Sequence, residues 1–75
     1  MSDMTGKIDQ YEKRFGIIAI EKGFIKPENL IEALKIQVEE EISSNRHRLI
    51  GEILMENGYI EPSQIKEVLD TIFSH

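Results

Sequence analysis

The sequence predicts an all-α domain in which two tandem helix-turn-helix hairpins, with about four helices in total, pack as a pseudo-symmetric small bundle. The first observation is an internal repeat: residues 16–37 align with residues 51–72 at an offset of 35, with eight identical pairs among 22 positions. The second is that apolar residues recur at helical spacing on both sides of a glycine and proline corner in each copy. No segment shows the sustained alternation and turn signals of a β-hairpin.

The first copy predicts a helix from Ile8 to about Lys22. Gly23 follows at the position where helices often end in a left-handed residue, a conformation that costs glycine nothing. Two residues later, Ile25 can pack back onto the last helical turn. Pro27 suits the first turn of the next helix, because its missing N–H would have no partner there.

The second helix is expected to reach about Ser43, and the polar segment after it predicts a break in which Ser44 or Asn45 caps the third helix. The glycine and proline corner then returns at Gly58 and Pro62, before a fourth helix. The expected inward-facing residues of the second helix are Leu30, Ile31, Leu34, Val38 and Ile42. Those of the third helix are Leu49, Ile50, Ile53 and Leu54, and those of the fourth are Ile65, Val68, Leu69, Ile72 and Phe73. The predicted organisation is a flexible N-terminus over residues 1–7 and one helical domain over 8–75, with repeats at about 14–37 and 49–72.

Composition limits the function. A chain of 75 residues is one small domain, and without cysteine it has no disulfide and no cysteine-based metal site. The net charge of −5 disfavours binding to a nucleic-acid polymer, which relies on a basic surface, and so argues against a helix-turn-helix DNA reader. No apolar run approaches the ~20 residues that cross a bilayer, so we expect no membrane insertion and a cytoplasmic location.

The sequence offers little support for catalysis or metal binding. It has no cysteine nucleophile, and no serine stands in a recognisable arrangement with a histidine and an acid. His47 and His75 lack metal-ligand spacing, and the consecutive acids 39–41 fan around a helix instead of converging on an ion. We therefore expect a protein that is not an enzyme and holds no metal.

The first copy also carries a family pattern. Arg14-Phe15-Gly16, followed by alanine, glycine, isoleucine, leucine and glutamine at residues 19, 23, 25, 30 and 37, resembles the motif R-L-G-x-x-L-V-x-x-G-x-I-x-x-x-x-L-x-x-A-L-x-x-Q. That motif marks the N-terminal domain of bacterial type II secretion and type IV pilus-assembly ATPases, and it occurs as a tandem pair in the branch that binds cyclic di-GMP. The resemblance covers about residues 14–72. No phosphate-binding loop of an ATPase is present, so the chain resembles this accessory domain standing alone.

The resemblance implies a set of ligand-binding residues in the first copy. An arginine would offer its fork to a phosphate or a guanine edge, a glycine would let the backbone approach, aliphatic side chains would cover the bases, and a glutamine would supply an amide. Carried over position by position, these are Arg14, Phe15, Gly16, Leu30, Leu34 and Gln37.

The second copy departs from the motif at both polar positions. Leu49 stands where the arginine is expected, and Ile72 stands where the glutamine is expected. Arg48 is one residue away and would substitute only if the backbone shifted, since one residue turns a helical side chain by about 100°. The recurrence of Gly16 and Gly51 fits close packing of helices, with close approach to a ligand as the alternative.

Two hypotheses follow. The first is a non-catalytic regulatory or interaction module that docks an apolar or acidic face onto a protein partner, such as a component of a secretion or pilus motor. The second is a receptor domain for cyclic di-GMP with one preserved and one degenerate half-site, in which homodimerisation would complete the second half. Arg14 and Gln37 favour the receptor, whereas Leu49 and Ile72 argue against it.

Overall fold

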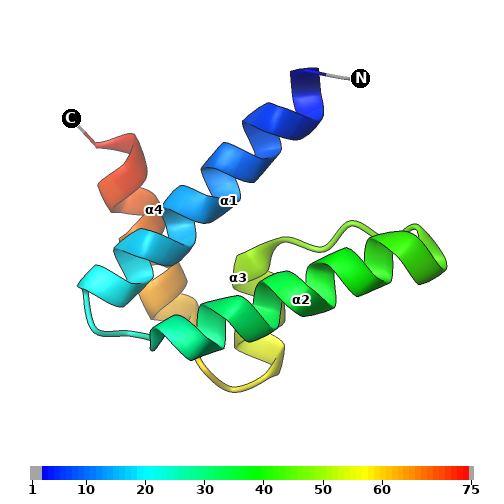
Figure 1. The fold of residues 1–75 in the computed structure, drawn as a ribbon. Helices are drawn as coiled ribbons and strands as arrows, with labels where there is room; N and C mark the ends of the chain where they lie inside the picture. Colours follow the sequence, from blue (N-terminus) through cyan, green and yellow to red (C-terminus); the bar gives the residue numbers. More distant parts are fainter. Residues whose placement is uncertain (1–2, 75) are drawn as a thin grey trace.

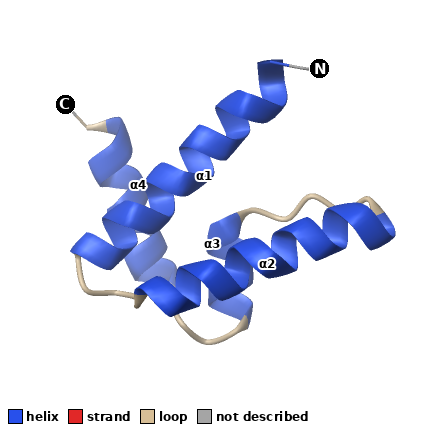
Figure 2. Ribbon diagram, viewed as in Figure 1, coloured by secondary structure: helices blue, strands red, loops and turns tan. Residues whose placement is uncertain are grey.

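The predicted all-α fold is confirmed. The computed structural model describes the backbone of residues 3–74 and the side chains of residues 11–74, and among these residues it has four helices and no strand. The helices, drawn in Figures 1 and 2, are α1 (Asp3–Glu21), α2 (Pro27–Ser44), α3 (Ile50–Glu56) and α4 (Pro62–Phe73). Each repeat therefore forms one helical hairpin, as the duplication predicts.

Helix α1 starts earlier than the apolar pattern predicts. It begins at Asp3, five residues before the expected start at Ile8, so residues 3–7 of the predicted flexible N-terminus are helical. Met1 and Ser2 lie outside the described residues. The apolar pattern could not show this extension because the added turn carries mostly polar residues.

The two glycine corners have the same geometry. Gly23 and Gly58 both have φ of 80°, the left-handed conformation predicted for this position. In the first corner the N–H of Phe24 donates to the carbonyl of Ala19 at 2.9 Å, and in the second the N–H of Tyr59 makes the equivalent bond to residue 54 at 2.9 Å. The isoleucines that follow, at 25 and 60, are 5% and 3% exposed, so each closes its corner by packing into the core.

The three later helices share one way of starting. In α2, α3 and α4 the third helical residue turns its side chain back to accept the N–H of the residue preceding the helix, at 2.9 Å in each case. The expectation that Ser44 or Asn45 caps α3 is wrong. Asn45 instead ends α2 in the left-handed conformation with φ of 56°, and an extended segment leads to Leu49, which precedes α3.

The closest packing joins one repeat to the other. Helix α3 packs against both α1 and α2, and α4 packs against α1, as Figure 1 shows from the placement of α3 behind α2 and of α4 behind α1. The two hairpins therefore stabilise each other. The buried apolar core consists of Phe15, Ala19, Ile25, Leu30, Ala33, Ile50, Ile53, Leu54, Ile60, Val68 and Ile72.

The predicted inner face of α2 is right in part: Leu30 is buried and Leu34 is half-buried against the core, but the buried face is turned away from the other predicted residues. The buried residues of α2 are Leu30, Ala33 and Gln37, whereas the predicted core residues Ile31, Val38 and Ile42 are 65%, 54% and 81% exposed. The reason is that α3 covers the α2 face that carries alanine and glutamine. Leu49 and Phe73, also predicted to face inward, are exposed as well.

Gly16 of α1 lies directly against the side chain of Leu30 in α2. A Cβ atom placed on it would lie 2.5 Å from a methyl carbon of Leu30, whereas a Cβ on Gly51 would lie 3.2 Å from the ring of Phe15. Helix packing therefore accounts for both glycines.

We expect Gly16→Ala to lower the free energy of unfolding, because overpacking costs about 1–3 kcal/mol and the gain in helix propensity returns only about 1 kcal/mol. The matched Gly51→Ala exchange, with room for a small ring movement, should change it by less than about 1 kcal/mol. Urea unfolding of both variants measures the difference. A Gly16→Ala protein as stable as the wild type would show that Leu30 moves aside freely.

Candidate functional site

A buried carboxylate joins the start of α3 to α1. Glu12 is only 4% exposed, and its Oε1 accepts the backbone N–H of Ile50, the first residue of α3. The amide of Gln37 also approaches Oε1, at 3.4 Å. One side chain of α1 thereby positions two elements that are distant in sequence.

Burial raises the pKa of the Glu12 carboxyl above its ordinary value, because the charged form loses water. The N–H of Ile50 and the amide of Gln37 oppose this shift by donating to the carboxylate, and the nearby His47 also lowers the pKa. Glu52, a neighbouring acid, adds to the rise. A raised carboxyl pKa is common at functional sites, but it also arises in structural contacts such as this one.

Gln37 holds the segment before α3 in place. Its side chain is in the buried part of α2, and its Nε2 donates to the main-chain carbonyl of Arg48 at 2.9 Å. Together with the bond to Glu12, this engages the amide that the family resemblance assigns to a ligand. In the structure Gln37 therefore serves the fold.

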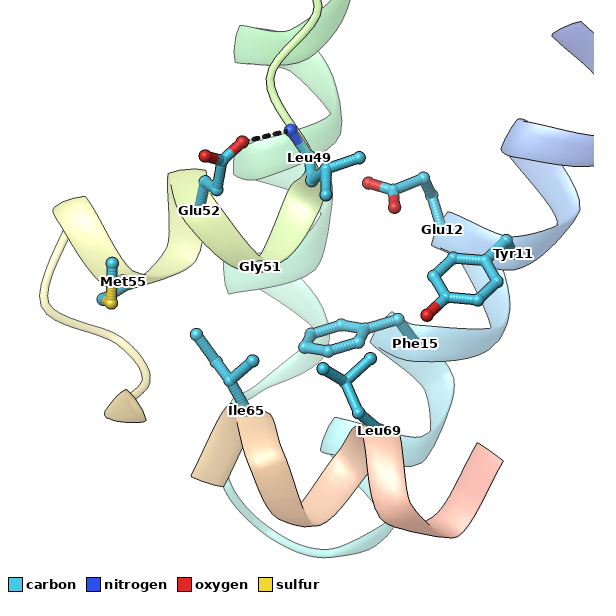
Figure 3. Close-up of a pocket in the computed structure, with 9 residues that line it drawn as sticks. All are labelled: Tyr11, Glu12, Phe15, Leu49, Gly51, Glu52, Met55, Ile65 and Leu69. Atoms are coloured by element: carbon cyan, nitrogen blue, oxygen red, sulfur yellow. Dashed lines mark hydrogen bonds between the residues drawn. The ribbon is translucent and has the colours of Figure 1, made fainter. Parts of the chain in front are cut away.

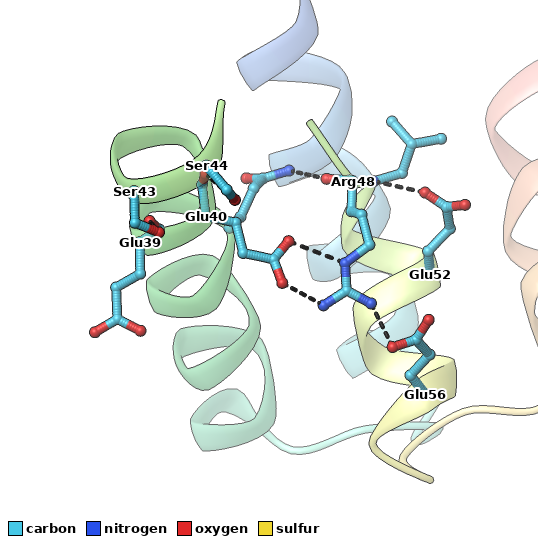
Figure 4. Close-up of polar contacts among 9 residues, drawn as sticks. Glu39, Glu40, Ser43, Ser44, Arg48, Glu52 and Glu56 are labelled. Carbon is cyan, nitrogen blue, oxygen red and sulfur yellow. Dashed lines mark hydrogen bonds and ion pairs between the residues drawn. The ribbon is translucent and has the colours of Figure 1, made fainter. Parts of the chain in front are cut away.

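Arg48 is held by two carboxylates (Figure 4). Its Nε and Nη2 donate to both oxygens of Glu40, at 2.9 and 2.6 Å, and its Nη1 donates to Glu56. The hydrogen bonds to Glu40 and then Glu56 raise the pKa of the guanidinium, and the same contact lowers the pKa of Glu40. This bidentate ion pair occupies the guanidinium N–H groups that would otherwise bind a phosphate.

An apolar groove lies between α1, α3 and α4. It has a volume of about 190 Å³ and is lined by Tyr11, Glu12, Phe15, Leu49, Gly51, Glu52, Met55, Ile65 and Leu69. Figure 3 shows Leu49 and Glu12 on one side and the α4 residues Ile65 and Leu69 on the other, with the ring of Phe15 between them. Of the predicted ligand residues, Phe15 is the one that lines this groove.

The structure distributes the predicted ligand residues over several environments. Phe15, Gly16 and Leu30 are buried in the packing, and Leu34 is half-buried beside the core. Arg14 is exposed and makes no ion pair with any residue whose side chain is described. Arg14 and Arg48 therefore occupy different settings, one open to solvent and one already paired.

The two departures in the second repeat also have clear places. Ile72, at the glutamine position, is 8% exposed and belongs to the core. Leu49, at the arginine position, is 47% exposed and lines the groove. An apolar surface thus stands where the resemblance would place an arginine.

Glu12 is a structurally central residue that the sequence interpretation missed. A signal for it was present, because it lies three and seven residues before Phe15 and Ala19, both of which are buried on the same face of α1. An acid at a core-facing position indicates a specific buried partner. That partner, the N–H of Ile50, could be identified only from the fold.

Among the described residues, no three histidines or acids cluster as metal ligands, and no helix is both long and apolar enough to span a membrane. Comparisons with known protein families, with curated proteins and with solved structures found no match to this chain.

Proposed function

We propose that the chain is a non-catalytic protein-interaction module that binds its partner through an exposed apolar stripe on α2. The stripe consists of Ile31, Val38 and Ile42, which are 65%, 54% and 81% exposed. Large aliphatic residues gathered on one exposed face commonly mark a contact with another protein. This stripe is the observation that carries the proposal.

The spacing of the stripe suits a helical docking face. Steps of seven and four residues bring side chains back to nearly the same side of a helix, since each residue turns about 100°. The three side chains span about 16 Å along α2 at ~1.5 Å per residue. The stripe is therefore long enough to contact several turns of a partner helix.

The contacts of the domain's polar side chains support a binding role without catalysis. Gln37, Arg48 and Glu12 have unusual burial or pairing, but each is engaged in contacts that hold α3 in place. A catalytic acid or base needs access to a substrate atom. The family resemblance, which covers about residues 14–72, suggests a component of a secretion or pilus motor as the partner.

Affinity capture from extracts of the source cell tests this function. We expect wild-type protein to recover a specific partner and Ile42→Lys to recover at least about tenfold less, because a lysine would be buried without a counter-charge at the contact. Ser43→Lys is the matched control, since it adds the same charge one residue away, about 100° around the helix. Equal recovery by Ile42→Lys and Ser43→Lys would contradict the proposal.

A cyclic di-GMP receptor is the second candidate, and the exposed Arg14 is the observation that favours it. Its guanidinium is open to a phosphate, unlike that of Arg48. The engagement of Gln37 by Arg48 and Glu12 weighs against this candidate, as does the burial of Ile72.

Titration with cyclic di-GMP separates the two candidates. The interaction proposal predicts no saturable heat in calorimetry up to about millimolar ligand, where binding would be worth only about 4 kcal/mol. Saturable binding in the micromolar range that disappears in Arg14→Ala would establish the receptor instead. Arg46→Ala, which removes another exposed arginine, is the control for a general charge effect.

A further inference from the structure

The geometry points to a second docking site: the groove between α1, α3 and α4 accepts a large apolar side chain from a basic, amphipathic helical segment of a protein partner. This inference rests on the proposed role in protein binding but uses a surface separate from the α2 stripe. It commits to the chemistry of the occupant, apolar at the contact and cationic beside it. Both halves of that chemistry come from the residues that line the groove.

The size of the groove fits side chains better than a small molecule. The volume of the groove is about 190 Å³. Pockets for drug-sized ligands usually run from about 300 to 1,000 Å³. One or two large apolar side chains would fill the available space.

The floor and walls of the groove are apolar. The ring of Phe15 lies between Leu49 on one side and Ile65 and Leu69 on the other (Figure 3). Gly51 keeps the floor open, because a Cβ there would already lie 3.2 Å from that ring. Burying an apolar side chain here would remove apolar surface from water on both partners.

Two exposed apolar side chains form the edge of the groove. Leu49 and Met55 are 47% and 40% exposed, and the core does not need their outer surfaces. Methionine is flexible and polarisable, so it adapts to differently shaped partners and is common at binding surfaces. These two side chains could close over an inserted residue.

The charges at the groove select the partner. Glu52 is exposed and uses Oε1 to accept the N–H of Leu49, so its Oε2 has no hydrogen-bond partner among residues 11–74. Glu12, the other acid of the lining, is buried and bound to the N–H of Ile50. No lysine, arginine or histidine lines the groove. With a net charge of −5 for the whole chain, a lysine or arginine flanking the inserted apolar residue would be favoured.

A designed peptide tests this site even though the natural partner is unidentified. The probe is an amidated leucine–lysine peptide of about 14 residues, roughly four helical turns, labelled for fluorescence anisotropy. Measurements at about 0.15 M salt limit long-range attraction between unlike charges. We expect saturable binding by the wild-type protein and none by the same peptide with glutamate in place of lysine.

Matched variants locate the binding. Leu49→Lys and Met55→Lys should each weaken the peptide by about tenfold or more, while Ser63→Lys, which adds the same charge on exposed α4 surface, should change it by less than about twofold. Circular dichroism checks that each variant is folded. If one groove variant fails to fold, the other still tests the site.

The inference is overturned if the wild-type protein does not bind the basic peptide, if it binds the acidic peptide equally, or if Ser63→Lys weakens binding as much as the groove variants do. These outcomes leave the α2 proposal standing, because that proposal depends on partner capture by Ile42→Lys. Conversely, undiminished partner capture by Ile42→Lys would contradict the proposed role of the α2 stripe but would not affect the peptide result.

Discussion

Leu54→Ala is expected to lower the free energy of unfolding by about 2–5 kcal/mol, the usual range for truncating a buried leucine. Leu54 is fully buried in α3, the helix that packs against both α1 and α2. A domain of this length has only about 4–11 kcal/mol of total stability, so this single change should remove a large share of it. Chemical denaturation at neutral pH measures the loss.

Ile31→Ala is the control for this prediction. It removes an aliphatic side chain of similar size from α2, but Ile31 is 65% exposed and contributes little to the core. We expect a change within about 0.5 kcal/mol, as for most surface substitutions. A loss comparable to that of Leu54→Ala would show that the α2 stripe is part of the fold and would weaken its assignment to a partner.

Glu12→Ala should have the second largest effect, a loss of about 1–3 kcal/mol, because the buried N–H of Ile50 would lose its acceptor. Glu12→Gln keeps an oxygen for that N–H and removes the buried charge. We therefore expect Glu12→Gln to be at least as stable as the wild-type protein at pH 7. If both variants lost the same stability, the role of Glu12 would lie in its charge.

The same pair gives a prediction for pH. Because burial raises the folded-state pKa of Glu12 above 4.5, its ionised form opposes folding, and this penalty disappears as the pH falls through the raised value. As the pH falls from 7 towards 4.5, wild-type stability should therefore rise more steeply than that of Glu12→Gln. Below about 4.5 the opposite trend should begin, because the pKa of Glu40 is lowered by Arg48 and protonation breaks their contact.

Thermal or urea unfolding across this range checks the pH dependence. The general decline in negative charge affects both proteins alike, so the difference between the two curves isolates Glu12. Its ionisable neighbours, His47 and Glu52, remain in both proteins. Parallel curves would contradict the assignment.

The repeat made the corners of the fold predictable. Gly23 and Pro27 have local roles that depend only on backbone conformation and on a missing N–H, and the duplication at residues 58 and 62 repeats the same signals. Their positions in the structure match the prediction. Local chemistry of this kind does not depend on the tertiary fold.

The buried face of α2 could not be predicted in the same way. Helical periodicity correctly places Leu30 and Leu34 toward the core, but it also places Ile31, Val38 and Ile42 there, and these three are exposed. What decides the face is packing against α3 and α1: Glu12 of α1 and the main-chain carbonyl of Arg48, just before α3, accept hydrogen bonds from the side-chain amide of Gln37. Apolar periodicity cannot identify a buried glutamine, because its hydrogen-bond partners come from other elements of the fold.

The candidate sites follow the same division. The polar residues carried over from the family pattern, Arg14 and Gln37, can be identified by type and spacing. The engagement of Gln37 within the chain depends on tertiary contacts with Glu12 and the carbonyl of Arg48. In the sequence, Leu49 shows only that the second repeat lacks the arginine expected at this motif position. Its place on the groove appears once α4 is packed against α1.

The most direct measurement of the central claim is methyl-resolved NMR of the protein with its captured partner. We expect the methyl signals of Ile31, Val38 and Ile42 to shift or broaden on addition of the partner, while those of the buried Leu54 and Val68 stay unchanged. If the signals of the α2 stripe stay unchanged while the partner binds, the stripe is not the binding surface, and the proposed function of α2 is wrong.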